Sequence, residues 1–276
     1  ASSMQRISYN EPVYDQKEEF DPSLVRLNTI EKLSSYCDSL YNATYPRRSS
    51  FAIDEAYPTV ATEVIRKRFY HGYSLYGFNS NYLAMAFAQV TMPGLSAIVI
   101  PDDILKYPYA ACSQQSIVLM GLLQNKGYKT RSVGFSSGIT GHFTFETYYD
   151  GGWHYNDPNK EPNEAVLKAY NNPSIAFLNQ HPAILQRAYS QYPKEYVMEV
   201  FTNYSYGAVN TFPAPKALLF QKVCKFLSYM MWSFFLLAFI WVRKKYKRMG
   251  QPGIVKNKSR LFIFRKTPVP ASYSAA

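Results

Sequence analysis

The chain is poor in cysteine, and it lacks the short motifs that mark several common enzyme classes. Only 3 of its 276 residues are Cys, which is too few for a disulfide-rich scaffold. It contains no phosphate-binding glycine loop and no C-x-x-C pair, so two frequent signatures of functional sites are missing. The sequence shows no internal repeat, and its length fits one large domain or two small ones.

Acidic residues are missing from the C-terminal part of the chain. Residues 243–276 hold ten of the 30 Lys and Arg and none of the 19 Asp and Glu. The net charge of +11 therefore belongs to this tail, because the rest of the chain is close to neutral. A basic face that could follow phosphates is not indicated in the rest, so we do not expect nucleic acid as a partner.

Charge is also missing from residues 226–242, an apolar run with two Trp that directly precedes the basic tail. A bilayer core needs about 20 apolar residues, with a range of about 17–25, and Trp suits the membrane interface. We therefore predict a transmembrane helix over residues 218–242, after a Pro-rich spacer at residues 213–217. The positive-inside rule makes residues 243–276 a cytoplasmic tail.

This topology predicts a single-pass protein of the cell membrane. Its main domain, residues 1–212, is expected outside the cytoplasm, in the periplasm or the extracellular space, with a core at about residues 82–160. Residues 1–30 contain no apolar run, and Ala1 is not an initiator Met. We therefore expect that a signal peptide has been cleaved or that an upstream helix is missing from the sequence.

The most informative stretch of the sequence covers residues 109–157. Residues 113–125 carry apolar side chains at helical spacing, and Pro108 and Gly127 are suitable start and stop signals. Cys112 then lies at the first turn of a buried helix, where free backbone N–H groups and the helix dipole favour a thiolate. A lowered thiol pKa is what a nucleophilic cysteine needs.

A tight hairpin is predicted after this helix. The Asp150-Gly151 pair is typical of a two-residue type I′ turn, and that turn places Thr144 opposite Asp157. His142 shares the face of Thr144 because side chains of a strand alternate with a period of two. His142 and Asp157 then form a diagonal pair within side-chain reach. The expected strands are residues 129–135, 142–149 and 152–157.

A Cys at a helix start, a His at a strand start and an Asp on the next strand resemble the transglutaminase-like branch of the papain-like cysteine enzymes. The resemblance covers about fifty residues, AACSQQSIVLMGLLQNKGYKTRSVGF and GHFTFETYYDGGWHYNDPN. It implies an α+β fold in which the Cys-bearing helix packs on an antiparallel sheet. It also implies that Cys112 is the nucleophile, His142 the general base and acid, and Asp157 the residue that orients His142.

The implied reaction is acyl transfer through a thioester on an amide of a protein or peptide substrate, ending in hydrolysis or transamidation. No cofactor and no metal are expected. Ala111 and Ser113 depart from the family pattern, which often has Gly before the Cys and an acidic residue or Arg after it. A second interpretation therefore stays open: an inactive accessory subunit of a membrane complex that secretes or assembles a surface polymer.

Other candidate site residues have simpler explanations. Asp102 and Asp103 are adjacent and point in different directions, so we interpret them as a helix cap and not as metal ligands. His154 is expected on the opposite side of the hairpin from His142, which argues against a metal site between them. His71 lies in a Tyr-rich loop and is expected to face solvent.

The remaining cysteines and segments are interpreted from their surroundings. Cys37 and Cys112 could pair outside the cytoplasm, but an unpaired Cys112 suits a nucleophile better. Cys224 falls in the predicted membrane segment.

The basic residues 66–68 are interpreted as a solvated helix face. Helices are expected at residues 24–41, 57–69, 81–90, 164–171 and 183–189, and a strand or an approach to the membrane at 197–203.

Overall fold

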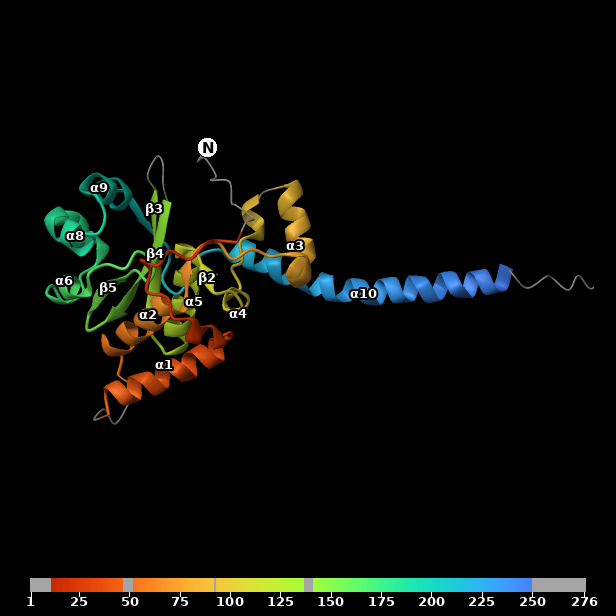
Figure 1. Ribbon diagram of the computed structural model, residues 1–276, viewed down its shortest axis with the longest axis horizontal. Helices are drawn as coiled ribbons and strands as arrows, with labels where there is room; N and C mark the ends of the chain where they lie inside the picture. The colour runs from red at the N-terminus through yellow and green to blue at the C-terminus, as the bar shows by residue number, and fades with distance from the viewer. Residues whose placement is uncertain (1–10, 47–51, 92, 137–140, 250–276) are drawn as a thin grey trace, which may run out of the picture. The chain divides into compact units, whose positions relative to one another are not determined.

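The computed structural model describes residues 11–46, 52–91, 93–136 and 141–249. These residues form a mixed domain of helices and strands and one long C-terminal helix (Figure 1). The chain divides into two compact units, Ala1–Tyr229 and Met230–Ala276. The first unit therefore extends past the predicted domain end at residue 212 and includes the beginning of the long helix.

A four-stranded antiparallel sheet forms the centre of the domain. Its strand order is β5-β4-β3-β6, so the predicted hairpin lies at one edge. Two short strands, β1 and β2, form a separate parallel pair. The strands are β1 (Tyr70–His71), β2 (Tyr109–Ala110), β3 (Lys129–Ser136), β4 (Gly141–Tyr149), β5 (Gly152–Asn156) and β6 (Tyr204–Tyr206).

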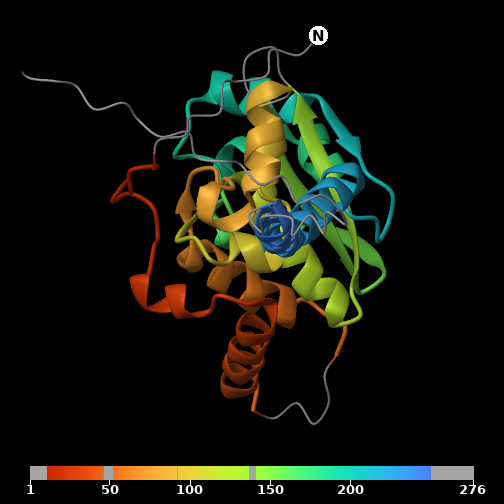
Figure 2. The same ribbon diagram turned by 90° about the vertical axis from the view of Figure 1, so that its right-hand side faces the viewer.

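Helices cover both faces of this sheet (Figures 1 and 2). On one face α1, α2 and α5 form a core with Phe145 and Tyr149 of β4. On the other face the helices α6 to α9 form a second core with Val133 and Phe135 of β3 and with Tyr155 of β5. The helices are η1 (Pro22–Arg26), α1 (Ile30–Thr44), α2 (Ala56–Arg68), α3 (Phe78–Val90), η2 (Pro93–Ser96), α4 (Pro101–Ile104), α5 (Cys112–Asn125), α6 (Glu164–Lys168), α7 (Ile175–Gln180), α8 (Pro182–Ala188), α9 (Lys194–Thr202) and α10 (Pro215–Met249).

The hairpin has the predicted turn and register. Asp150 and Gly151 have φ values of 47° and 80°, as a type I′ turn requires at its two central residues. Tyr149 pairs with Gly152, and the ladder continues to Phe145 opposite Asn156. Each of the three strands ends within one residue of its expected limits.

Two local interpretations were wrong. Residues 197–203 are not a strand, because Val197, Val200 and Phe201 are buried at helical spacing on α9. Arg68 does not belong to a solvated face, because its side chain is fully buried. It donates to four backbone carbonyls, those of Val25, Leu27, Leu105 and Tyr107.

The long helix α10 begins at Pro215, so residues 215–217 of the predicted spacer are already helical. Gln221, Cys224 and Ser228 are buried and repeat at helical spacing, which places one side of the first turns against the domain. Cys224 lies in this helix, within the predicted membrane segment, but it is only 3% exposed and belongs to the main core of the domain. Among the described residues, Pro215–Lys247 is the one helix long and apolar enough to cross a membrane.

Candidate functional site

Cys112 is the first residue of α5, and only Ala111 separates it from β2. Its side chain is partly exposed. The parallel pairing of Tyr109 with Tyr70 and of Ala110 with His71 brings the loop after β1 beside the start of α5. The three cysteines of the chain all lie in the described residues and all are free, so Cys112 is a thiol and not half of a disulfide.

The buried side chain of Gln114 fixes the start of α5. Its Oε1 accepts hydrogen bonds from the backbone N–H groups of Ala111, at 3.1 Å, and Ser74, at 2.9 Å. Its Nε2 donates to the backbone oxygens of Ser74 and Ile98, each at 2.8 Å. Every polar group of this amide is therefore used, and the turn that carries Cys112 is held from both sides.

His142 is the second residue of β4, and its side chain is only 1% exposed. The ring stacks on Phe135, with centroids 5.8 Å apart, and meets the edge of Phe201 at 5.7 Å. Its Nε2 lies 2.8 Å from Oδ2 of Asp157. Its Nδ1 is buried and has no hydrogen-bond partner among the described residues, and the ring and the Cys112 thiol shift each other's pKa. The imidazole is thus held at Nε2, while Nδ1 is left without a partner among the described residues.

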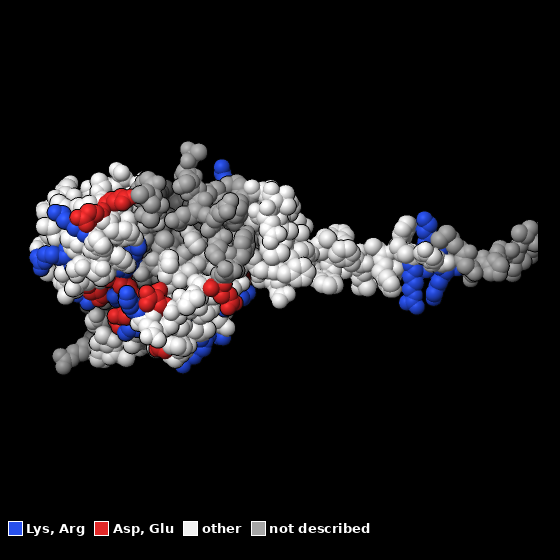
Figure 3. Space-filling view, turned by 45° about the horizontal axis from the view of Figure 1, so that its top comes forward, with Lys and Arg blue, Asp and Glu red and all other residues white. Residues whose placement is uncertain are grey.

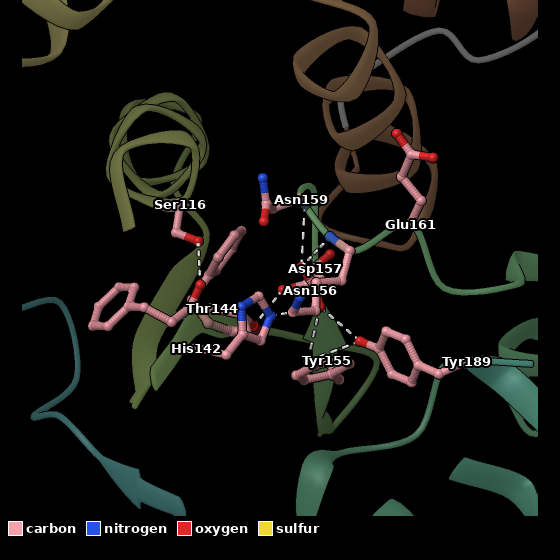
Figure 4. Close-up of polar contacts among 12 residues, drawn as sticks. Ser116, His142, Thr144, Tyr155, Asn156, Asp157, Asn159, Glu161 and Tyr189 are labelled. Carbon is pink, nitrogen blue, oxygen red and sulfur yellow. Dashed lines mark hydrogen bonds and ion pairs between the residues drawn. The ribbon is translucent and has the colours of Figure 1, made fainter. Parts of the chain in front are cut away.

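Asp157 is bonded through both of its carboxylate oxygens (Figure 4). Oδ2 accepts from His142 and from the hydroxyl of Tyr189, at 2.7 Å, with the hydroxyl of Tyr155 at 3.3 Å. Oδ1 accepts from the backbone N–H groups of Asn159 and Lys160, each at 3.1 Å. Asp157 is therefore both a turn residue and the partner of His142: Oδ1 bonds the backbone of the turn, and Oδ2 bonds the imidazole.

The charges of the three residues are coupled. Burial raises the pKa of the Cys112 thiol, but the His142 ring and a hydrogen bond from the Phe143 backbone lower it more, and the net pKa lies below the ordinary thiol value. Burial lowers the pKa of His142, yet Asp157 and Cys112 raise it above that of a free imidazole. The structure therefore favours a thiolate beside an imidazolium.

The Asp157 carboxyl completes this arrangement. Burial raises its pKa, but the charge of His142 and the hydrogen bonds from His142, Tyr189 and the Lys160 backbone hold that pKa well below its usual range. The carboxylate is therefore ionised at neutral pH and stabilises the charged imidazole beside it.

Two site residues escaped the sequence reasoning. Tyr155 precedes Asp157 by two residues, so the period of the strand could have placed it on the same face. Tyr189 follows α8, and its hydroxyl lies 3.0 Å from that of Tyr155. Nothing in the sequence around Tyr189 links it to the hairpin, because this contact depends on how the later helices pack on the sheet.

The other candidate residues lie elsewhere or have structural partners. His154 bonds the backbone oxygens of Tyr149 and Asn172, on the opposite face from His142. His71 is exposed, as expected, and its Nδ1 lies 3.1 Å from the Asn159 amide. Within the described part of the chain, no group of three or more His, Cys, Asp or Glu is placed to hold a metal ion.

Asp102 and Asp103 do not cap the helix α4 that they begin. Oδ1 of Asp102 instead accepts the backbone N–H of Ile30, the first residue of α1, at 2.8 Å. Asp103 is buried and bonds Tyr76, Lys106 and Lys225. Both carboxylates therefore join segments that are distant in the sequence.

Comparison with known proteins gives no independent identification. No family model, no curated protein and no solved structure matches the chain. The resemblance to transglutaminase-like enzymes therefore depends on the residues of the 109–157 stretch and on their geometry.

Proposed function

We propose that this chain is a membrane-anchored cysteine enzyme of transglutaminase-like type that acts on an amide by acyl transfer through a thioester. The observation that carries the proposal is the bond between His142 and a buried, ionised Asp157, together with the lowering of the Cys112 pKa by that same His142 ring. A nucleophile, a base and a third group that fixes the base are the components that such a reaction needs.

The proposed reaction has two halves. The Cys112 thiolate attacks the amide carbonyl carbon, and the C–N bond breaks as His142 gives its proton to the leaving amine. The acyl group then remains on sulfur as a thioester. Water or a second amine attacks that thioester and passes a proton to His142, the C–S bond breaks, and the thiolate–imidazolium pair forms again.

Asp157 and its tyrosine partners support this sequence of proton transfers. An imidazole whose Nε2 is bonded to a carboxylate keeps its orientation and leaves Nδ1 to give and take the proton. Tyr189 and the backbone of Lys160 keep the carboxylate ionised and in place. Their role is positioning, because none of them meets the reacting sulfur.

The anchor in this proposal is α10. Its apolar stretch, exposed for most of its length, is long enough to span a bilayer, and the basic residues 243–248 follow the stretch. The positive-inside rule places those residues in the cytoplasm and the domain with Cys112 outside it. Protease protection of an N-terminal tag in sealed membrane vesicles measures this topology.

The test of activity uses the full-length chain, a casein peptide mixture and a biotin-labelled primary amine. Mass spectrometry reads peptide cleavage and amine incorporation separately. We expect one of these products from the wild-type chain and from S113A, and a loss of about 10³-fold or more in C112A. Equal product from C112A would remove the enzyme proposal.

One observation favours the accessory role as a second candidate. The His142 side chain is almost fully buried, whereas a general acid must reach the leaving amine. If none of the variants forms product and the protein is isolated from native membranes in a stable complex, the domain serves as a subunit of that complex.

A further inference from the structure

The helix α3 and its flanking turns carry no charge over a long stretch. No Asp, Glu, Lys or Arg occurs between Phe78 and Ile100. Phe78, Phe87 and Val90 are 74%, 50% and 85% exposed, while Ala84 and Ala88 on the inner side are fully buried. The surface of α3 is correspondingly without blue or red in Figure 3. An apolar outer face of this kind marks a contact surface.

This helix lies beside the first turns of α10, as both ribbon views show (Figures 1 and 2). The rings of Phe87 and Phe220 meet edge to face with centroids 6.1 Å apart. The Asn81 amide donates to the backbone oxygen of Gln221 at 3.1 Å, and the Tyr82 hydroxyl donates to that of Ser228 at 3.3 Å. The two helices are therefore fixed to each other within the domain.

The first turns of α10 have an apolar outer side of their own. Leu219, Val223 and Phe226 are all strongly exposed there, and the same helix continues into the stretch that is long enough to cross a membrane. We propose that the exposed face of α3 lies in the membrane interface next to α10, as a second contact between the domain and the bilayer. An apolar helix face of this kind binds in the plane of the interface, between headgroups and acyl chains.

The bilayer is the occupant that the surroundings of α3 favour. A helix bonded to the base of a membrane span meets the same bilayer surface that the span enters. The uncharged residues of α3 offer no ion pair to a protein partner, whereas lipid needs none. The half-exposed Phe87 of this surface also contacts Phe220 of α10.

The membrane contact is joined to the candidate site through Gln114. The residues before and after α3 are joined by backbone hydrogen bonds, which form the neck of this segment. The Ile98 N–H donates to the Ser74 oxygen at 3.0 Å, and the Tyr76 N–H donates to the Ser96 oxygen at 2.9 Å. Gln114 bonds both Ser74 and Ile98 of this neck. It lies two residues after Cys112, so the bilayer contact and the nucleophile share one fixed support.

The test is a spin-label accessibility measurement on the full-length chain in lipid nanodiscs. The label is attached to V90C in a C112S background, where the remaining Cys37 and Cys224 are buried. The matched control is S39C on α1, an exposed position outside α3 and α10. We expect collisions with oxygen to exceed those with a water-soluble nickel complex at V90C, and the reverse at S39C.

Two results would overturn the proposal. A V90C label with the same preference for nickel as S39C would place α3 in water. A V90C label that is immobile and shielded from both reagents would place α3 against another protein surface.

Discussion

Asp157 is the residue whose surroundings explain the most about the site. It accepts hydrogen bonds from three side chains, those of His142, Tyr155 and Tyr189, and from two backbone N–H groups. Such a saturated carboxylate stays ionised, and its charge raises the pKa of the buried His142. The state of the Cys112 thiol therefore depends on a residue that the sulfur does not touch.

The variant D157N tests this dependence. An Asn in this position carries no charge, so burial dominates and the pKa of His142 falls below its wild-type value. Because an imidazolium no longer faces the sulfur, the pKa of Cys112 rises in the same variant. NMR titration of the chain labelled at its four His measures the first shift, with H142Q used for assignment.

The control for this titration is D102N, whose carboxylate bonds the Ile30 backbone and is not a partner of the His142 ring. It should leave the His142 titration unchanged. An unshifted His142 in D157N would mean that the carboxylate does not control the ring.

Arg68 is a second buried charged residue with several hydrogen bonds, and its role is purely structural. Its guanidinium is fully buried and donates to carbonyls of η1, of the turn before α1 and of the segment after α4. It thereby joins the N-terminal segments to the residues that lead into β2. Replacement leaves several buried acceptors without donors, and each of these costs about 1–3 kcal/mol.

We therefore expect R68M to lower the free energy of unfolding by about 3–5 kcal/mol. Chemical denaturation followed by tryptophan fluorescence measures this loss. The neighbouring Lys67 bonds only Glu63 at the surface, so K67M should change stability by less than about 1 kcal/mol. Similar losses in both variants would contradict this role of the buried Arg68 hydrogen bonds.

At the scale of the elements, the buried amide of Gln221 bonds the helix α10 to the domain. Gln221 donates to the backbone oxygens of Leu95 and Ala97 and accepts the N–H of Val99 at 2.9 Å. Lys225, one turn later, bonds both oxygens of Asp103 at 2.7 Å. The first turns of this helix are therefore a part of the folded domain and not a flexible tether.

The substitution Q221L separates these two possibilities. It keeps the volume but leaves two carbonyls and one N–H without partners, so we expect a loss of about 2–4 kcal/mol. Thermal unfolding in detergent, read by circular dichroism, shows this as a lowered Tm. The exposed Leu219 supplies the control, since L219A should shift Tm only slightly. An unchanged Tm in Q221L would indicate that the domain folds without α10.

The sequence was sufficient to predict the local helices and strands but not how they pack against one another. The Asp150-Gly151 turn fixes its own register, so the relation of β4 to β5 followed from period-two alternation. The apolar spacing after Cys112 likewise placed α5. By contrast, Gln221 and Arg68 look like ordinary polar residues in the sequence. Their burial depends on carbonyls more than 35 residues away in the chain.

At the scale of the whole molecule, the candidate site combines the start of α5, the β4–β5 hairpin and Tyr189, which comes later in the chain. Cys112, His142 and Asp157 lie within one continuous stretch, which is why the sequence could propose them. Tyr189 reaches them only because α8 and α9 cover the second face of the sheet. The catalytic role of the site stays a prediction, and it requires a Cys112 thiolate at neutral pH.

The rate of Cys112 alkylation by iodoacetamide as a function of pH, read by mass spectrometry, tests that requirement most directly. Cys37 is the internal reference, because burial raises the pKa of its thiol to about 12. We predict that the inflection in the Cys112 rate lies below the ordinary thiol pKa of about 8.5, because the pKa of this thiol is lowered. A rate that instead rises through about pH 8.5, as for an unperturbed thiol, would contradict the account.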